Sequence, residues 1–245
     1  MELLIFGLNE PEKICGSRDD PADVCGWEGV KCNAHGEVEE FVWKHYFEDG
    51  TGTIGFEFLP WSMKIVRMLY NALSGTIQLA DLPGRMEELT LSFNQLTGSL
   101  DLDRLPAAVL ELYLNENKFT GVVSLENLPM CLIYLSLADN QLSGAICLTS
   151  LPPALDTLYL ENNNFEGSLE FTRLPASLRV IYLSENRFSG TIDLGNLPKN
   201  MTYVNVRKNA LTGRVRIPPT LFCWADERDI HRLFEGNNEL IVEKM

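Results

Sequence analysis

The sequence repeats with a period of 23 residues over most of its length. A Leu-Pro pair, an asparagine and a glycine each recur at this interval without a break. A unit of 23 residues is too short to enclose a core, so its apolar side chains are buried only when each unit stacks on the next. The period therefore predicts a solenoid. The Leu-Pro pairs begin at positions 59, 82, 105, 128, 151, 174 and 197, the asparagines stand at 71, 94, 117, 140, 163, 186 and 209, and the glycines at 52, 75, 98, 121, 144, 167, 190 and 213.

The apolar residues keep fixed places within each unit. In the unit around Asn163, Leu158 and Leu160 are separated by one residue, and Ile181 and Leu183 take the same places one unit later. A spacing of two is typical of a strand that buries one face. We therefore expect one half-buried strand in each unit.

The pattern Leu-x-Leu-x-x-Asn-x-Leu/Phe-x-Gly-x-Ile resembles the leucine-rich repeat, and its Gly-x-Ile segment is closest to the plant-type version. The resemblance covers roughly residues 38–217. It implies an α/β solenoid: a right-handed horseshoe with a concave parallel β-sheet, a second, shorter row of strands on the convex flank, and little helix. The 23-residue Leu-Pro unit also resembles repeats of protist proteins, especially those of kinetoplastids.

The two ends of the chain depart from the repeat, as the caps of a solenoid must, because a bare terminal unit exposes its core. We expect an N-terminal cap over residues 1–37, about eight repeats over residues 38–217, of which seven are regular, and a C-terminal cap over residues 218–245. The N-terminal cap is predicted to begin with a short amphipathic helix from Glu2 to Leu8. The C-terminal cap is predicted to contain a helix over residues 220–235, with Gly236 as its stop, and a final strand near residues 240–242.

The asparagine, glycine and proline columns have structural explanations. A stacked asparagine side chain offers donors and an acceptor to backbone groups that leave the sheet. Glycine permits backbone angles that a Cβ resists. Proline holds the chain extended where no amide donor is needed. We therefore expect these three columns to build the fold and not to bind a ligand.

Charge excludes several classes of function. The chain has 34 acidic and 20 basic residues, a net charge of −14. This balance argues against a nucleic-acid partner and against binding to an anionic membrane surface. No apolar run approaches the roughly 18–20 residues that a membrane span requires, so no membrane insertion is expected.

Motifs of known chemistry are missing from the sequence. It contains no glycine-rich phosphate loop of the form Gly-x-x-x-x-Gly-Lys-Ser/Thr, no Gly-x-Ser-x-Gly, no His-Glu-x-x-His and no Cys-x-x-Cys. The three histidines, His35, His45 and His231, are scattered along the chain. We therefore predict that the protein is not an enzyme and that it holds no cofactor and no metal.

The cysteines are compatible with two cellular compartments. The stretch CGWEGVKC from Cys25 to Cys32, followed by V-x-x-F-x-W from Val38, resembles the N-terminal cap of plant-type repeat proteins. In that family the two cysteines form a disulfide, which implies an oxidising compartment, and Cys15 is a competing partner. The chain has no secretion signal if it is complete, which predicts a cytoplasmic protein; if it is a mature fragment, an extracellular or cell-surface location is predicted instead. The cytoplasmic alternative is favoured by three cysteines without evident partners: Cys131, Cys147 and Cys223.

The residues that flank the buried leucines are expected to point outward from the concave sheet. Five of the seven tyrosines fall on this surface, among acidic residues and with a basic residue near each end. Tyrosine is favoured in interfaces because it combines a broad ring, a polar tip and few rotamers. The alternative is that strands simply favour tyrosine. The candidate partner-binding residues are Arg67, Glu88, Glu111, Tyr113, Tyr134, Tyr159, Glu161, Tyr182, Tyr203 and Arg207.

These features predict a non-enzymatic protein-protein interaction module, monomeric on its own, that binds a protein or peptide on its concave face. A rigid, preformed surface loses little entropy on binding. Two alternatives stay open: a structural subunit of a larger assembly, and a cell-surface receptor or antigen-like protein that binds a glycan. The first 50 residues, with twelve acidic and four basic residues, are either a solvated cap or a docking patch for a basic partner around Asp19, Asp20 and Asp23.

Overall fold

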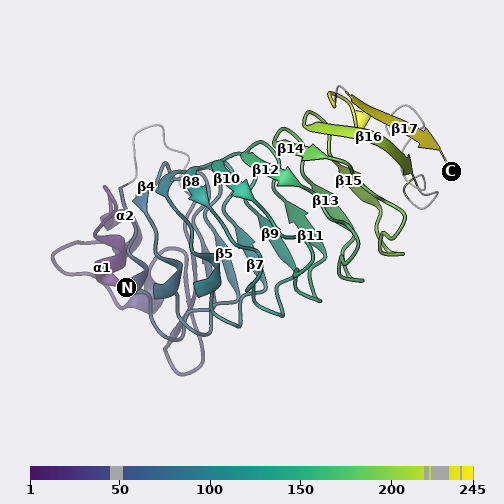
Figure 1. The fold of residues 1–245 in the computed structure, drawn as a ribbon. Coiled ribbons are helices and arrows are strands. Elements are labelled where there is room, and N and C mark those ends of the chain that lie inside the picture. The colour runs from purple at the N-terminus through teal and green to yellow at the C-terminus, as the bar shows by residue number, and fades with distance from the viewer. Residues whose placement is uncertain (45–51, 218–220, 222–231, 238, 245) are drawn as a thin grey trace.

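The protein is a coil of stacked turns with one sheet on each of two sides (Figure 1). The structure is a computed structural model that describes residues 1–44, 52–217, 221, 232–237 and 239–244. From β3 onward, each turn contributes one strand to each sheet, and the two termini lie at opposite ends of the coil. The expected solenoid of 23-residue turns with little helix is confirmed.

The first sheet has nine strands. Its first two strands are antiparallel, and from β2 onward all neighbours are parallel and paired in register, so that Leu89 lies opposite Leu112 and Leu112 opposite Leu135. A period of 23 residues thus places equivalent side chains side by side. The strands, in spatial order, are β1 (Val30–Cys32), β2 (Val38–Val42), β3 (Ile65–Arg67), β5 (Glu88–Thr90), β7 (Glu111–Tyr113), β9 (Tyr134–Ser136), β11 (Thr157–Tyr159), β13 (Val180–Tyr182) and β15 (Tyr203–Asn205).

The second sheet has eight strands and includes the glycine column. Parallel pairing again links consecutive turns, for example Gly144 with Phe165. The strands follow the reverse spatial order, and the last strand of the chain lies at one edge. They are β17 (Glu239–Lys244), β16 (Ala210–Ile217), β14 (Arg187–Gly190), β12 (Asn164–Ser168), β10 (Gln141–Ala145), β8 (Lys118–Val122), β6 (Gln95–Gly98) and β4 (Ser74–Thr76).

The core runs between the two sheets along the whole coil. Leu112 and Leu114 are fully buried on the first sheet, and Phe119 is fully buried below the second. One unit apart, the rings of Phe165 and Phe188 stack with centroids 6.3 Å apart. Each fully buried leucine or phenylalanine side chain stabilises the fold by about 1.5–3 kcal/mol, so stability accumulates turn by turn.

The asparagine column forms a hydrogen-bonded ladder between turns. The side-chain oxygen of Asn94 accepts hydrogen bonds from the backbone amides of Asn71 (3.1 Å) and Leu73 (2.9 Å). Its side-chain nitrogen donates to the carbonyls of Met68 (2.8 Å) and Leu91 (2.9 Å). These bonds satisfy backbone groups that have left the sheet, as the sequence indicated. The bond that Asn94 accepts from Leu73, two residues after the preceding asparagine, has an equivalent in each later turn. The accepting asparagines are Asn117, Asn140, Asn163, Asn186 and Asn209.

Two columns of residues along the coil have an unusual backbone conformation. The glycine column has positive φ, for example +89° at Gly98. The residue directly before each asparagine also has positive φ, although none of these residues is a glycine. This second column went unnoticed in the sequence because its residue types vary. Its members are Tyr70, Phe93, Glu116, Asp139, Asn162, Glu185 and Lys208.

The N-terminal end is closed by two short helices and the antiparallel strand pair. The two helices are α1 (Glu2–Ile5) and α2 (Glu12–Cys15), and a 3-10 turn, η1 (Val24–Gly26), follows them. Cys25 and Cys32 form the expected disulfide, whereas Cys15 is buried and free. The first helix is shorter than predicted, because the carbonyl of Gly7 accepts a hydrogen bond from the amide of Thr53 (3.0 Å) and Leu8 forms an antiparallel bridge with Gly52.

The C-terminal end extends the asparagine ladder by one step. Asn237 accepts a hydrogen bond from the amide of Leu211 (3.0 Å) and donates to the carbonyls of Val206 (3.0 Å) and Phe234 (2.8 Å). Strand β17 (Glu239–Lys244) lies where the sequence predicted a final strand. The helix expected over residues 220–235 falls mostly outside the described residues, as does Cys223. Single 3-10 turns occur at η2 (Phe56–Phe58), η3 (Leu79–Asp81) and η4 (Leu102–Arg104).

Candidate binding face

The candidate surface is the outer side of the nine-stranded sheet. In β7, Leu112 is fully buried while Glu111 and Tyr113 on either side of it are half-buried. The strand pleat turns alternate side chains to opposite faces, and the in-register pairing aligns the outward ones in columns. All ten candidate residues lie on or directly beside this surface, and we call it the tyrosine face.

Five tyrosines form a continuous row of ring contacts across the tyrosine face. They come from five neighbouring strands, β7 to β15. The ring centroids are 4.3 Å apart between Tyr113 and Tyr134, 5.6 Å between Tyr134 and Tyr159, 4.8 Å between Tyr159 and Tyr182, and 4.7 Å between Tyr182 and Tyr203. The first and last pairs are stacked and the middle two are tilted. We call this row the tyrosine ladder.

Burial of the rings controls the ionisation of the ladder. It raises the pKa of Tyr113, Tyr134, Tyr159 and Tyr182, and neighbouring carboxylates add to the effect. Tyr113 also donates a hydrogen bond of 2.6 Å to Glu111. The tyrosine hydroxyls therefore keep their protons at neutral pH and remain available as hydrogen-bond donors.

The basic residue at the N-terminal end of the face is neutralised by its neighbours. Arg67 donates two hydrogen bonds to Glu88 on the adjacent strand, and its NH1 lies 3.3 Å from Glu40 Oε1. Glu88 also accepts a hydrogen bond of 3.2 Å from Thr90. The sequence predicted a basic rim here, but the guanidinium charge is already paired within the sheet.

The C-terminal end has the same arrangement. Arg207 and Lys208 both contact Glu185 Oε1 at 3.0 Å. These ion pairs lower the pKa of Glu185. Sequence reasoning did not single out Glu185, which belongs to the column before the asparagines; its place one turn from Arg207 and Lys208 was the signal.

Glu161 differs from the other carboxylates of the face. Its Oε2 is buried and has no hydrogen-bond partner among the residues that the structure describes. Burial raises the pKa of Glu161 to about 7, and the negative charge of Asp139 contributes to this shift. The carboxyl group is thus half protonated near neutral pH.

An aromatic pair borders the face at its N-terminal half. Tyr70 directly precedes Asn71, and Phe93 directly precedes Asn94 in the next repeat. Their rings stack with centroids 4.2 Å apart, and each residue is about 40% exposed. The sequence did not identify this pair because the column before the asparagines had no assigned role. Equivalent positions one turn apart in the stacked repeat are what bring the two rings together.

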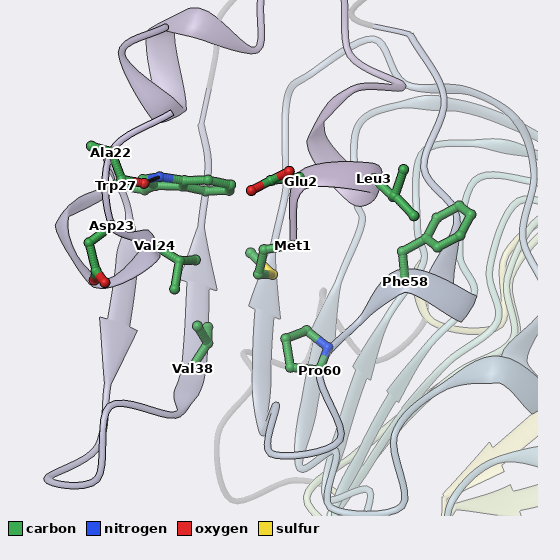
Figure 2. Close-up of a pocket in the computed structure, with 10 residues that line it drawn as sticks. All are labelled: Met1, Glu2, Leu3, Ala22, Asp23, Val24, Trp27, Val38, Phe58 and Pro60. Atoms are coloured by element: carbon green, nitrogen blue, oxygen red, sulfur yellow. Dashed lines mark hydrogen bonds between the residues drawn. The ribbon is translucent and has the colours of Figure 1, made fainter. Parts of the chain in front are cut away.

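A groove lies in the N-terminal cap, between α1, η1 and β2, with a volume of about 610 Å³. Figure 2 shows Leu3 and Phe58 side by side at one end and Trp27 at the other. Leu3 is 62% exposed. Asp23, predicted as part of an acidic patch, accepts a hydrogen bond from the amide of Cys25 (3.0 Å), so it caps η1.

The described residues contain neither a candidate metal site nor a candidate membrane-spanning helix. Within the described ranges, no three histidine, cysteine, aspartate or glutamate side chains are placed to hold a metal ion. In the same part of the chain, no helix has the length and apolar character to cross a membrane.

The comparisons with known proteins rest on structure. No family model and no curated protein matches the sequence. The LRR ectodomain of the Arabidopsis receptor kinase HAESA, in complex with an N-terminal extended IDA peptide hormone ligand, is 28% identical over 75% of this chain and 35% of its own, with a TM-score of 0.53. The present chain therefore has a plant-type leucine-rich repeat fold.

Two further solved structures are similar to this chain in fold. The LRR ectodomain of the plant membrane receptor kinase GASSHO1/SCHENGEN3 from Arabidopsis thaliana, in complex with CASPARIAN STRIP INTEGRITY FACTOR 2, is 24% identical over 90% of this chain and 30% of its own, with a TM-score of 0.65. A plant ice-binding protein is 19% identical over 99% of this chain and 96% of its own, with a TM-score of 0.53. The present chain thus spans about a third of the two receptor chains.

Proposed function

We propose that this leucine-rich repeat protein is a non-enzymatic binding module whose tyrosine face holds a polypeptide segment. The observation that carries the proposal is the tyrosine ladder, one half-buried ring on each of five neighbouring strands. Strands lie about 4.8 Å apart, so the five strands span about 19 Å of preformed surface. A surface of rigid aromatic side chains binds at a small entropic cost.

Ring geometry favours a polypeptide over a glycan. A sugar stacks on an exposed aromatic face, but in the pairs Tyr113–Tyr134 and Tyr182–Tyr203 the ring faces cover one another. Such stacked pairs present ring edges and hydroxyl groups to a ligand. Edges and hydroxyls suit the mixed apolar and hydrogen-bonding surface of a peptide. The solved HAESA ectodomain is in complex with a peptide hormone ligand, which supports the same class of partner here.

The proposal is tested by selecting a displayed random peptide library on the immobilised protein. We expect enrichment on the wild type and its loss on the double variant Tyr113→Ala/Tyr159→Ala, with circular dichroism and thermal unfolding used to confirm that the variant is folded. The matched control is Thr97→Ala/Val122→Ala, which removes two exposed side chains from the eight-stranded sheet and retains enrichment. Equal enrichment on the wild type and on the tyrosine variant contradicts the proposal.

The Cys25–Cys32 disulfide supports a protein that works in an oxidising compartment. Peptide mapping after alkylation without reduction, on protein from its native source, is expected to recover the two cysteines in one linked peptide. Recovery of both as alkylated thiols contradicts this placement.

A further inference from the structure

The carboxylates of the tyrosine face fall into two groups. Glu88 is bound by Arg67, Glu111 accepts a hydrogen bond from Tyr113, and Glu185 is bound by two cations. Glu161 alone, among the described carboxylates of this face, keeps a buried oxygen with no partner. A buried acceptor left unpaired costs about 1–3 kcal/mol, and more when it is charged. Its presence on an otherwise paired surface points to a group supplied from outside the chain.

The position of Glu161 links it to the ladder. It follows Tyr159 by two residues, at the end of β11. The charge of Glu161 contributes to the raised pKa values of Tyr134, Tyr159 and Tyr182, so its carboxyl group lies beside the middle of the ladder. A ligand that lies along the rings therefore comes close to the half-buried side chain of Glu161.

Local charge selects the chemistry of the missing partner. Asp139 acts electrostatically on Glu161, and Glu116, one turn before Asp139, is in turn affected by it. This negative surrounding repels an anion and attracts a cation. Arg207 and Lys208, two turns further along this edge, are held by Glu185, and no described basic side chain forms an ion pair with Glu161.

We propose that Glu161 is the specificity-determining residue of the tyrosine face, and that it pairs with an arginine or lysine side chain of the bound polypeptide. The neighbouring rings add to this preference, because aromatic side chains attract a cation that lies against them. The inference rests on the proposed peptide-binding function. It goes further by fixing one side chain of the ligand.

The experiment uses peptides selected from the random library at pH 8 on the wild-type protein. We expect the ladder-dependent peptides to share one arginine or lysine, and Glu161→Gln to weaken the best of them by about tenfold or more. Replacing that arginine by citrulline, its uncharged analogue, is expected to weaken binding to the wild type by a similar factor but to leave binding to Glu161→Gln unchanged. Glu166→Gln, an exposed carboxylate on the eight-stranded sheet, is the control and binds as the wild type does.

Acid gives a second readout. The pKa of Glu161 is raised by burial and by Asp139, and it is lowered by a hydrogen bond from its own backbone amide. Glu161 in turn contributes to the raised pKa of Tyr134, Tyr159 and Tyr182, whose hydroxyls stay neutral. Because the pKa of Glu161 in the free protein is about 7, affinity for the arginine peptide is expected to fall as the pH is lowered through 7, while affinity for the citrulline peptide stays constant.

The outcomes separate this inference from the function on which it rests. Ladder-dependent peptides that share no basic residue, or that bind Glu161→Gln as tightly as the wild type, overturn the role of Glu161 and leave the binding face in place. Peptides whose capture does not depend on Tyr113 and Tyr159 overturn both.

Discussion

The two sheets of the solenoid are built by the same repeat, yet they present different side chains. Both pair in parallel and in register, one strand per turn. The outward residue before each glycine of the eight-stranded sheet is small and polar in most turns, as at Thr97, Thr120 and Ser189. The nine-stranded sheet presents tyrosines and carboxylates instead. Since the fold treats the two sheets alike, their different chemistry supports a role in recognition for one of them.

The tyrosine face and the asparagine ladder, which lies between the two sheets, differ in how completely their polar groups are satisfied. The asparagine ladder bonds every one of its side chains to the neighbouring turns, as at Asn117. On the tyrosine face, Glu161 keeps an unpaired oxygen within the described part of the chain. A residue that builds the fold has its partners inside the fold, whereas a residue that binds does not. Substitutions at four features of the molecule test how much each contributes to stability.

The largest effect on stability is expected from the asparagine ladder. Asn117→Ala leaves the buried amide of Leu96 without its bond of 3.0 Å. It also removes one of two side-chain hydrogen bonds to the carbonyl of Leu91 (2.9 Å), the other coming from Asn94. We expect the free energy of unfolding to fall by about 2–4 kcal/mol, measured by urea denaturation. Asn127→Ala, at an exposed position outside the ladder, is the control and changes it by less than about 0.5 kcal/mol. Equal losses in both variants refute a structural role that is specific to the column.

The glycine column comes next. At Gly98, φ is +89° and a Cβ would lie 2.8 Å from the methyl carbon of Thr76, whereas at Gly190, φ is +78° and the nearest atom, in Ser168, is 3.8 Å away. Gly98→Ala is expected to cost about 2–3 kcal/mol and Gly190→Ala about 1 kcal/mol, because only the first adds a steric clash to the backbone strain. Urea denaturation measures both. Identical costs show that the Thr76 side chain moves aside.

A smaller effect that depends on pH is expected at Glu161. Its pKa is about 7 in the folded protein, above the value in the unfolded chain, so the wild type loses stability as the pH rises from about 4.5 through 7. Glu161→Gln does not share this loss. We expect its Tm to match the wild type near pH 4.5 and to exceed it by about 2–4 °C at pH 8, after allowance for solvent screening. A Tm difference that is constant with pH contradicts the unpaired carboxylate.

The smallest effect is expected from the ion pairs that close the face. Arg67→Ala removes the partner of Glu88 and Glu40, and because such surface pairs contribute little, the cost is at most about 1 kcal/mol and declines in 1 M salt. Arg187→Ala, on the eight-stranded sheet, removes only a hydrogen bond to Asn164 and serves as the comparison. Stability is measured by thermal unfolding at both salt concentrations. A larger loss of stability in Arg187→Ala than in Arg67→Ala contradicts the prediction.

The sequence alone was sufficient to predict the regular part of the fold. A fixed period forces equivalent residues to stack, so the neighbours of Leu112, Asn117 and Gly121 had to be the equivalent residues one unit before and one unit after each of them. The same logic brought the five tyrosines to one face. It also indicated the strand at the C-terminus and, through the resemblance, the Cys25–Cys32 disulfide.

What the sequence could not show depends on side-chain geometry or on a broken period. Arg67 and Arg207 were expected as basic rims, but their pairing with Glu88 and Glu185 follows from rotamers, not from spacing. The unpaired oxygen of Glu161 likewise depends on where its neighbours point. Asn237 was overlooked as the last step of the ladder because it stands 28 residues after Asn209, by subtraction of their positions, and not 23.

The uniform bonding from turn to turn makes the length of this protein adjustable. A 23-residue segment that begins at any point in one repeat and ends at the same point in the next meets the same leucines, asparagine and glycine at both junctions. Duplicating or deleting such a segment lengthens or shortens both sheets by one strand, about 4.8 Å, without creating a new kind of contact. Unequal recombination within the coding sequence therefore supplies longer and shorter forms that still fold, and the reach of the binding surface can evolve separately from its chemistry.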